Sequence, residues 1–326
     1  MSNPSKRRAL ICGISGQDGA YLSKFLLDNN YEVWGTTRKL NLSNFSKLDA
    51  LAVSSFVKII KMTPHIYSSV MEAITKVCPN EIYYFSGQSS VANSFIQPVE
   101  TFESITLGVI NILEAIRITG QEIKFYNAGS SESFGGDNYD SCNEETAFNP
   151  QSPYAVAKSA SAYQVKVYRE VYGIFASTGI LFNHESPLRP ENFVTRKIVT
   201  AAHRIALGSD EKLLLGNLDI SRDWGWAPEY VRAVWLILQQ HHPEDFVIGT
   251  GKSQTLRDFV ATVFNEFGLK WDRHVVVKDD LKRIKDPIRI LANPEKAKKL
   301  LLWEADCVGM GVPRRLAQLQ IEGKFL

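Results

Sequence analysis

The sequence has no long apolar run, almost no net charge and few cysteines. No apolar run reaches the roughly 18 residues of a membrane-spanning helix, so we expect no membrane span. A formal net charge of only +2 argues against a nucleic-acid partner. The 4 cysteines have no paired spacing, which predicts reduced thiols in a cytosolic protein rather than a disulfide framework or a bound metal.

The N-terminus also lacks the features of a secretory signal. In "MSNPSKRRALICG", basic residues lead directly into a short apolar strand, without the longer apolar region and small-residue cleavage site of such signals. Neither internal repeats nor low-complexity linkers interrupt the chain. These features predict a globular protein of the cytoplasm.

What the sequence does contain is an alternation of strand-like and helix-like segments. Short apolar runs predict strands at residues 8–14, 31–37, 81–87, 122–129, 174–183 and 245–251. Helical spacing appears at residues 20–29, 68–77, 106–120, 152–173, 195–207, 228–240 and 255–268. Such alternation predicts an α/β Rossmann fold, in which helices cover both faces of a doubly wound parallel sheet.

The pattern becomes less regular after about residue 183, where a loop-like segment rich in proline and charge begins. We therefore expect a cofactor-binding Rossmann domain at residues 1–182, to which segments near 225–252 return. Residues 183–326 are expected to form mainly a smaller C-terminal substrate-binding lobe.

Three glycines separate the first strand from the first helix. In "CGISGQDGAY", Gly13, Gly16 and Gly19 have G-x-x-G-x-x-G spacing. Glycines at this place let backbone N–H groups approach a pyrophosphate at a helix N-terminus, although a purely structural turn is the alternative. The strand–loop–helix context favours dinucleotide binding, and we assign Gln17 and Asp18 to the same cofactor loop.

Basic residues after the second strand predict which dinucleotide binds. An NAD-binding carboxylate is expected about 20 residues after the glycines, but Arg38 and Lys39 occupy this point. A cation there suits the 2′-phosphate of NADP, whereas a solvated basic loop is the alternative. We predict NADP as the cofactor, with Arg38 as a ligand.

Tyr154 and Lys158 in "YAVAK" are four residues apart, so they lie on one helix face. A phenol with a pKa of about 10 is a poor base at neutral pH, but a neighbouring ammonium favours the phenolate. The Y-x-x-x-K spacing alone is common, and it gains weight from Ser130 in "AGSSE", a hydroxyl partner at the end of an upstream strand. The set is typical of proton removal from a substrate hydroxyl during hydride transfer.

Longer motifs run in order along nearly the whole chain. They are "GISGQDGAYL", "GQSSV", "SSESFG", "SPYAVAK", "GILFNHESP", "NFVTRKI", "LGNLDISRDWGWAPEYVRA" and "VIGTG". Together they resemble the GDP-mannose 4,6-dehydratase family of extended short-chain dehydrogenases/reductases, and "NHESP" followed by "FVTRKI" and "RDWG" is the most specific part. The resemblance implies NADP-dependent dehydration of GDP-mannose or GDP-manno-heptose to a GDP-4-keto-6-deoxy sugar.

The implied reaction oxidises carbon 4, eliminates water across carbons 5 and 6, and returns hydride to carbon 6. By resemblance, Tyr154 is the base of the oxidation and Lys158 also binds the nicotinamide ribose. Glu132 takes the carbon 5 proton and assists departure of the carbon 6 hydroxyl. Ser130 stands where the family typically has threonine and keeps the hydroxyl.

The resemblance also implies substrate contacts and an assembly. The implied substrate-binding residues are Gln88, Ser89, Asn183, Arg196, Lys197, Gly216, Asn217, Arg222, Arg283 and Asp286. A GDP-linked sugar is then the partner, and a homodimer or homotetramer the expected assembly.

The sequence departs from the family at several positions, and other functions compete. Lys61 and Met62 stand near the place of a carboxylate that contacts adenine, and Ser133 and Phe134 follow Glu132 where leucine and tyrosine are typical. The alternatives are a 4-reductase or epimerase of a nucleotide sugar, which would not need Glu132, and a non-catalytic NADP-binding protein.

Overall fold

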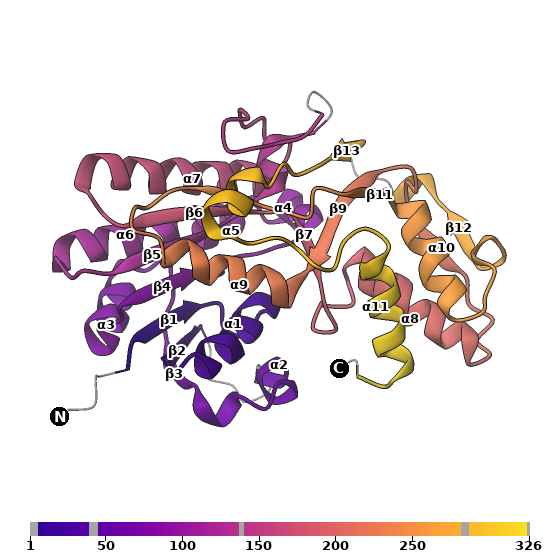
Figure 1. Ribbon diagram of the computed structural model, residues 1–326, viewed down its shortest axis with the longest axis horizontal. Helices are drawn as coiled ribbons and strands as arrows, with labels where there is room; N and C mark the ends of the chain where they lie inside the picture. Colours follow the sequence, from indigo (N-terminus) through magenta and orange to yellow (C-terminus); the bar gives the residue numbers. More distant parts are fainter. Residues whose placement is uncertain (1–5, 39–44, 137–139, 282–286, 325–326) are drawn as a thin grey trace.

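A parallel sheet of seven strands forms the centre of the computed structural model, in the order β10-β6-β5-β4-β1-β2-β3 (Figure 1). The structure describes residues 6–38, 45–136, 140–281 and 287–324. The strands of this sheet are β1 (Arg8–Cys12), β2 (Glu32–Thr37), β3 (Lys58–Lys61), β4 (Glu81–Tyr84), β5 (Lys124–Ser130), β6 (Ala176–Leu181) and β10 (Phe246–Ile248). This sheet confirms the predicted α/β Rossmann fold.

Helices cover both faces of the sheet because its strands are apolar on both sides. Every residue of β4 and β6 is buried, as expected for central strands of a parallel sheet. One face packs against α1 (Gln17–Asp28) and α9 (Ala227–Leu238), and the other packs against α3 (Tyr67–Val77), α6 (Gly108–Thr119) and α7 (Pro153–Tyr172). The carboxyl ends of all seven strands therefore share one edge, where ligands of such sheets bind.

Two elements from the second half of the chain complete the sheet. The edge strand β10 pairs with β6, with Phe246 opposite Gly179. Helix α9 packs against α1 in the same apolar cluster, through residues that include Tyr230 and Leu22. The domain limits at residues 182 and 183 stay a prediction.

A second lobe lies beside the sheet, with α8 (Val194–Ala206), α10 (Leu256–Glu266) and α11 (Gly311–Ile321) around one apolar cluster (Figure 1). Its strand β9 (Ser221–Trp226) pairs with β7 (Asn183–Glu185), β11 (Ser253–Thr255) and β13 (Arg289–Ile290). A separate pair joins β8 (Leu213–Leu215) to β12 (Val275–Val277). The predicted loop after residue 182 thus begins with a short strand, because β7 pairs with a strand far along the chain.

The remaining helical elements are short. They are α2 (Ser46–Ala50), α4 (Val91–Ile96), α5 (Pro98–Phe102), η2 (Ser54–Phe56), η3 (Glu103–Leu107), η4 (Ser131–Phe134), η5 (Trp271–Arg273), η6 (Asp279–Leu281) and η7 (Ala297–Leu301). Among the described residues, no helix combines the length and apolar composition needed to cross a bilayer. The same part of the chain holds no group of three or more side chains suited to binding a metal.

Candidate active site

The glycine loop lies between β1 and α1, at the carboxyl edge of the sheet. Gly13 has a φ of +88°, and a Cβ there would lie 3.0 Å from the Phe85 backbone. A Cβ on Gly19 would lie 2.5 Å from the Gly13 carbonyl oxygen, so neither position has room for a side chain. Gly16 precedes the first residue of α1. This close turn at a helix N-terminus fits the pyrophosphate of a dinucleotide.

The side chains of Gln17 and Asp18 hold the segment at residues 184–186. Gln17 Nε2 donates to the His184 carbonyl oxygen over 3.2 Å, and Ser186 Oγ donates to Gln17 Oε1 over 2.7 Å. Asp18 Oδ1 lies 3.0 Å from His184 Nε2. These two predicted cofactor residues thus contribute backbone to the first turn of α1, while their side chains fix the neighbouring segment.

Two hydrogen-bond acceptors face the ring nitrogens of His184 and favour its charged form. Its Nδ1 lies 2.7 Å from the Phe182 carbonyl oxygen, and its Nε2 faces Asp18. Only an imidazolium donates from both nitrogens. Burial lowers the pKa of His184, but the charge and hydrogen bond of Asp18 outweigh burial and raise it above its ordinary value. Burial raises the pKa of Asp18, but His184 and Gln17 lower it to about 2.

Tyr154 and Lys158 lie on the first two turns of α7, whose start is capped by Ser152. Lys158 is 8% exposed, and its Nζ donates to the Ala128 carbonyl oxygen over 2.7 Å. The same Nζ lies 5.8 Å from the centre of the Tyr154 ring. Burial lowers the pKa of Lys158 to about 8, although the charge of Asp18 opposes this shift. The spacing thus places both groups at one edge of the sheet.

The pKa of Tyr154 moves opposite to the expected direction. Burial raises it to about 12, the hydrogen bond with Ser130 lowers it, and the charge of Glu132 raises it. The expected lowering by Lys158 does not dominate, because removing a phenolate from water costs more free energy than these partners return.

Ser130 and Glu132 lie where β5 ends and the short helix η4 begins. Ser130 Oγ accepts a hydrogen bond from the Glu132 backbone N–H over 3.3 Å and also bonds to Tyr154. The carboxylate of Glu132 is partly exposed and acts on the pKa of Tyr154, so the two side chains are electrostatic neighbours. The structure therefore brings together Ser130, Glu132, Tyr154 and Lys158, which are the four predicted catalytic residues.

Ser133 and Phe134 point into the core. Their exposed fractions are 1% and 0%. The Phe134 ring lies 5.4 Å from that of Phe148 and 6.2 Å from that of Phe182. This aromatic cluster anchors the turn that presents Glu132.

Arg189 belongs to the site, although sequence reasoning did not single it out. Its Nε lies 3.5 Å from Glu185 Oε2, and its guanidinium lies 3.7 Å from the centre of the Phe193 ring. Its positive charge lowers the pKa values of Tyr154 and Asp18. The only signal was a lone arginine in a segment read as a loop, which has no distinctive spacing.

The predicted 2′-phosphate ligand, Arg38, follows β2 at the same carboxyl edge. Its Nη1 lies 3.2 Å from Glu100 Oε1 in α5, so the cation has a carboxylate partner within the chain. Lys61 ends the adjacent strand β3 and is exposed, whereas Met62 is 1% exposed and packs in the core. Lys39 lies outside the described residues.

Two of the predicted substrate-binding arginines are buried and held by backbone carbonyls. Arg196 and Arg222 are 5% and 4% exposed. Arg196 donates to the Pro187 carbonyl oxygen over 3.0 Å, and Arg222 donates to that of Pro287 over 2.8 Å. Burial lowers the pKa of Arg196, and Glu191 opposes that shift. These contacts orient both guanidinium groups in the second lobe.

The other predicted substrate residues lie on several different elements. Lys197 Nζ donates to the Leu214 carbonyl oxygen over 2.8 Å, which brings α8 beside the turn that carries Gly216 and Asn217. Gln88, after β4, donates to the Ser90 carbonyl oxygen over 2.7 Å. The residues not yet placed are Ser89, which is exposed; Asn183, which begins β7; and Arg283 and Asp286, which lie outside the described residues.

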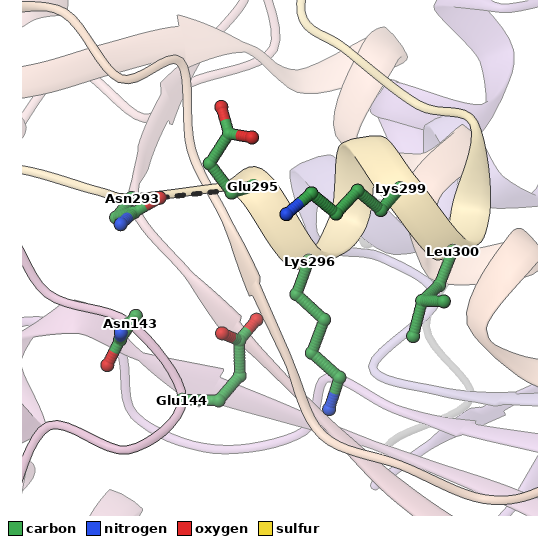
Figure 2. Close-up of a pocket in the computed structure, with 7 residues that line it drawn as sticks. All are labelled: Asn143, Glu144, Asn293, Glu295, Lys296, Lys299 and Leu300. Atoms are coloured by element: carbon green, nitrogen blue, oxygen red, sulfur yellow. Dashed lines mark hydrogen bonds between the residues drawn. The ribbon is translucent and has the colours of Figure 1, made fainter.

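A cavity at another part of the molecule contains none of these residues. It is lined by Asn143, Glu144, Asn293, Glu295, Lys296, Lys299 and Leu300 (Figure 2). Its polar groups bond within the chain: Asn293 Oδ1 accepts from the Glu295 N–H over 3.2 Å, and Glu144 Oε1 accepts from the Val247 N–H over 2.7 Å. We assign this cavity no part in the candidate site.

Solved structures with the same fold include several sugar-nucleotide enzymes. A dTDP-glucose 4,6-dehydratase from Streptomyces venezuelae with NAD and TYD bound matches with a TM-score of 0.85 and 20% identity, over 97% of this chain and 98% of that one. RMD from Pseudomonas aeruginosa complexed with NADPH matches with a TM-score of 0.78 and 18% identity, over 96% and 98%. At these identities the likeness establishes the fold alone.

Sequence relatives define the family. The family model described as GDP-mannose 4,6 dehydratase matches residues 10–309. GDP-mannose 4,6 dehydratase 1 of Arabidopsis thaliana is 42% identical over 309 residues, which is 92% of this chain and 85% of that protein. GDP-mannose 4,6-dehydratase of Yersinia enterocolitica is 44% identical over 275 residues, or 81% and 73%. The chain belongs to the GDP-mannose 4,6-dehydratase family of hydro-lyases.

Proposed function

We propose that the chain catalyses the NADP-dependent 4,6-dehydration of a GDP-sugar, GDP-mannose or GDP-manno-heptose, to a GDP-4-keto-6-deoxy sugar. The observation that carries this proposal is the convergence of Ser130, Glu132, Tyr154 and Lys158 at the carboxyl edge of the sheet. A simple reductase or epimerase needs the hydroxyl, phenol and ammonium groups but has no use for the carboxylate.

The chain's own residues fit a nicotinamide dinucleotide. The side-chain-free turn at Gly13 and Gly19 would hold its pyrophosphate, Arg38 the 2′-phosphate, and Lys158 the nicotinamide ribose. When bound, such a cofactor would supply hydride transfer from carbon 4 to carbon 6 of the sugar, and carbon 5 would then take up a proton, so that the net change is the loss of one water.

Tyr154 acts as the base for the carbon 4 hydroxyl. The phenol must first reach its phenolate form, and the positive charge of an oxidised nicotinamide ring bound beside it would favour that form. The Ser130 hydrogen bond stabilises the phenolate, and the Lys158 ammonium lies 5.8 Å from the ring. The proton of the sugar hydroxyl passes to the phenolate oxygen as the carbon–oxygen bond becomes a ketone.

Glu132 performs the elimination. The ketone at carbon 4 acidifies the proton on carbon 5, so a carboxylate is a sufficient base. The same group, now protonated, gives that proton to the departing carbon 6 hydroxyl, which leaves as water. Its position on η4, fixed by the buried Phe134, keeps the carboxylate beside Tyr154.

The remaining site residues are proposed to bind the nucleotide and the sugar. Arg196 and Lys197 supply positive charge for the diphosphate, because guanidinium and ammonium groups form charge-assisted bonds with phosphate oxygens. Arg222 belongs to the nucleotide pocket. Further proposed contacts to the nucleotide or sugar are Gln88, Ser89, Asn183, Gly216, Asn217, Arg283 and Asp286.

A substrate panel tests the proposal. Purified protein is incubated with GDP-mannose, GDP-manno-heptose, dTDP-glucose and CDP-glucose, and product mass is measured. We expect loss of one water from a GDP-sugar, with no net consumption of NADPH. Product formed only with stoichiometric NADPH would indicate a reductase, an isomer of unchanged mass an epimerase, and cofactor binding without any product a non-catalytic protein.

We further propose that the chain works in the cytoplasm as a homodimer or homotetramer. Helix α7 carries apolar side chains that face solvent, such as Val167 and Val171, which are 45% and 66% exposed. Such side chains could be covered by a second copy of the chain. Light scattering on the purified protein measures the assembly, and a mass equal to one chain would reject it. Fractionation of the source cells tests the location.

A further inference from the structure

The residue proposed to recognise the cofactor's 2′-phosphate already has an anionic partner. Arg38 follows β2, and Glu100 lies in α5, which comes after β4 and α4 in the chain. Arg38 Nη1 and Glu100 Oε1 are 3.2 Å apart, and the two side chains are 61% and 45% exposed. The distance is that of a direct hydrogen-bonded ion pair, and the exposure leaves both groups open to an incoming ligand.

We propose that Glu100 determines cofactor specificity by weakening the preference for NADP over NAD. This inference rests on the proposed function, in which Arg38 binds the 2′-phosphate. A phosphate that binds Arg38 must share or displace the Glu100 carboxylate, and the two anions then repel each other. NAD carries a free hydroxyl at that position, and a carboxylate can accept its hydrogen bond. Glu100 therefore disfavours one cofactor and favours the other.

A second role for Glu100 would be purely structural. It lies in the first turn of α5, where a carboxylate stabilises the positive end of a helix. That role changes the stability of the protein and the binding of both cofactors alike. An exposed ion pair also contributes little to folding. Only the specificity role changes the ratio of the two affinities.

The experiment measures the affinities of the full-length protein, freed of copurified nucleotide, for NADPH and NADH by calorimetry. Glu100→Gln keeps the size of the side chain and removes its charge. We expect the ratio of the NADH to the NADPH dissociation constant to rise about three- to tenfold. The rise should shrink between about 50 mM and about 500 mM salt, because the groups are exposed.

Two further variants separate the possible outcomes. Asp28→Asn removes an exposed carboxylate from the far end of α1, where it pairs with Lys24, and should leave the ratio unchanged. Arg38→Gln should bring the ratio toward one. If Arg38→Gln lowers the ratio but Glu100→Gln does not change it, the inference is wrong and the NADP assignment stands. If Arg38→Gln leaves the ratio unchanged, the proposed role of Arg38 fails and the inference fails with it.

Discussion

Charged side chains at the two ends of the sheet's carboxyl edge differ in their exposure to water. At the β5–α7 end, Lys158 is 8% exposed and burial moves its pKa to about 8. At the β2–β3 end, Arg38 is 61% exposed and pairs with Glu100 in contact with solvent. Charges interact strongly where water is excluded and weakly where salt and water screen them. Substitutions should therefore act almost all-or-none at the first end and in graded steps at the second.

The largest effect is expected for Tyr154→Phe at the buried end. Loss of the phenol removes the proposed base at carbon 4, so turnover should fall by about 10³–10⁴-fold. Product formation from the active GDP-sugar, measured by mass, tests this. Tyr163→Phe is the matched control, because Tyr163 lies on the same helix and is 55% exposed. Near-normal turnover of Tyr154→Phe would reject the oxidation step.

Glu132→Gln should be the next most severe change. The amide cannot take the carbon 5 proton, so turnover should fall by about 10²–10³-fold while oxidation at carbon 4 continues. The absorbance of reduced nicotinamide should therefore accumulate on the enzyme. Glu145→Gln changes an exposed carboxylate farther along the same loop. It should neither lower turnover nor cause that absorbance to accumulate. Slow turnover without that absorbance would place Glu132 in another step.

The comparison also separates what local sequence reveals from what it cannot. The spacing of Tyr154 and Lys158 and the glycine turn are local patterns, and the structure places them at one edge of the sheet as expected. The pKa of Tyr154 was expected to fall, but it depends on burial by segments distant in sequence. Arg189 and β7 were missed for the same reason, since their partners are set by tertiary packing.

The Asp18–His184 pair should give a pH-dependent contribution to stability. The pKa of His184 is raised, so its contribution is present below its unfolded value of about 6.5 and is lost as pH rises through the folded value. The pKa of Asp18 is lowered, so its contribution is present above about 3.9 and is lost as pH falls through about 2. The pair should stabilise the fold most between about pH 4 and pH 6.5.

Asp18→Asn tests this window, since it keeps a hydrogen-bond acceptor and removes the charge. We expect a loss of about 1–2 kcal/mol in the free energy of unfolding near pH 5.5, and a smaller loss near pH 8.5. Urea unfolding at both pH values measures the difference. Asp28→Asn, on the exposed end of the same helix, should show no such pH dependence. An equal loss for Asp18→Asn at both pH values would mean that His184 is not charged.

The smallest effect is expected for a substitution of Lys61, at the exposed β2–β3 end of the carboxyl edge. Lys61 ends β3 opposite Thr37, the residue before Arg38, and so adds a second cation near the proposed 2′-phosphate position. Because it is exposed, Lys61→Gln should weaken NADPH binding only about twofold and leave NADH binding unchanged.

Lys58→Gln is the matched control for that change. Lys58 begins the same strand, about 10 Å away, and its Nζ lies 2.7 Å from Glu32 Oε1. If Lys58→Gln weakens NADPH binding as much as Lys61→Gln does, the effect comes from net charge and not from position. If Lys61→Gln instead abolishes NADPH binding, substitutions at the β2–β3 end do not act in graded steps. The proposed contrast between the two ends of the edge is then wrong.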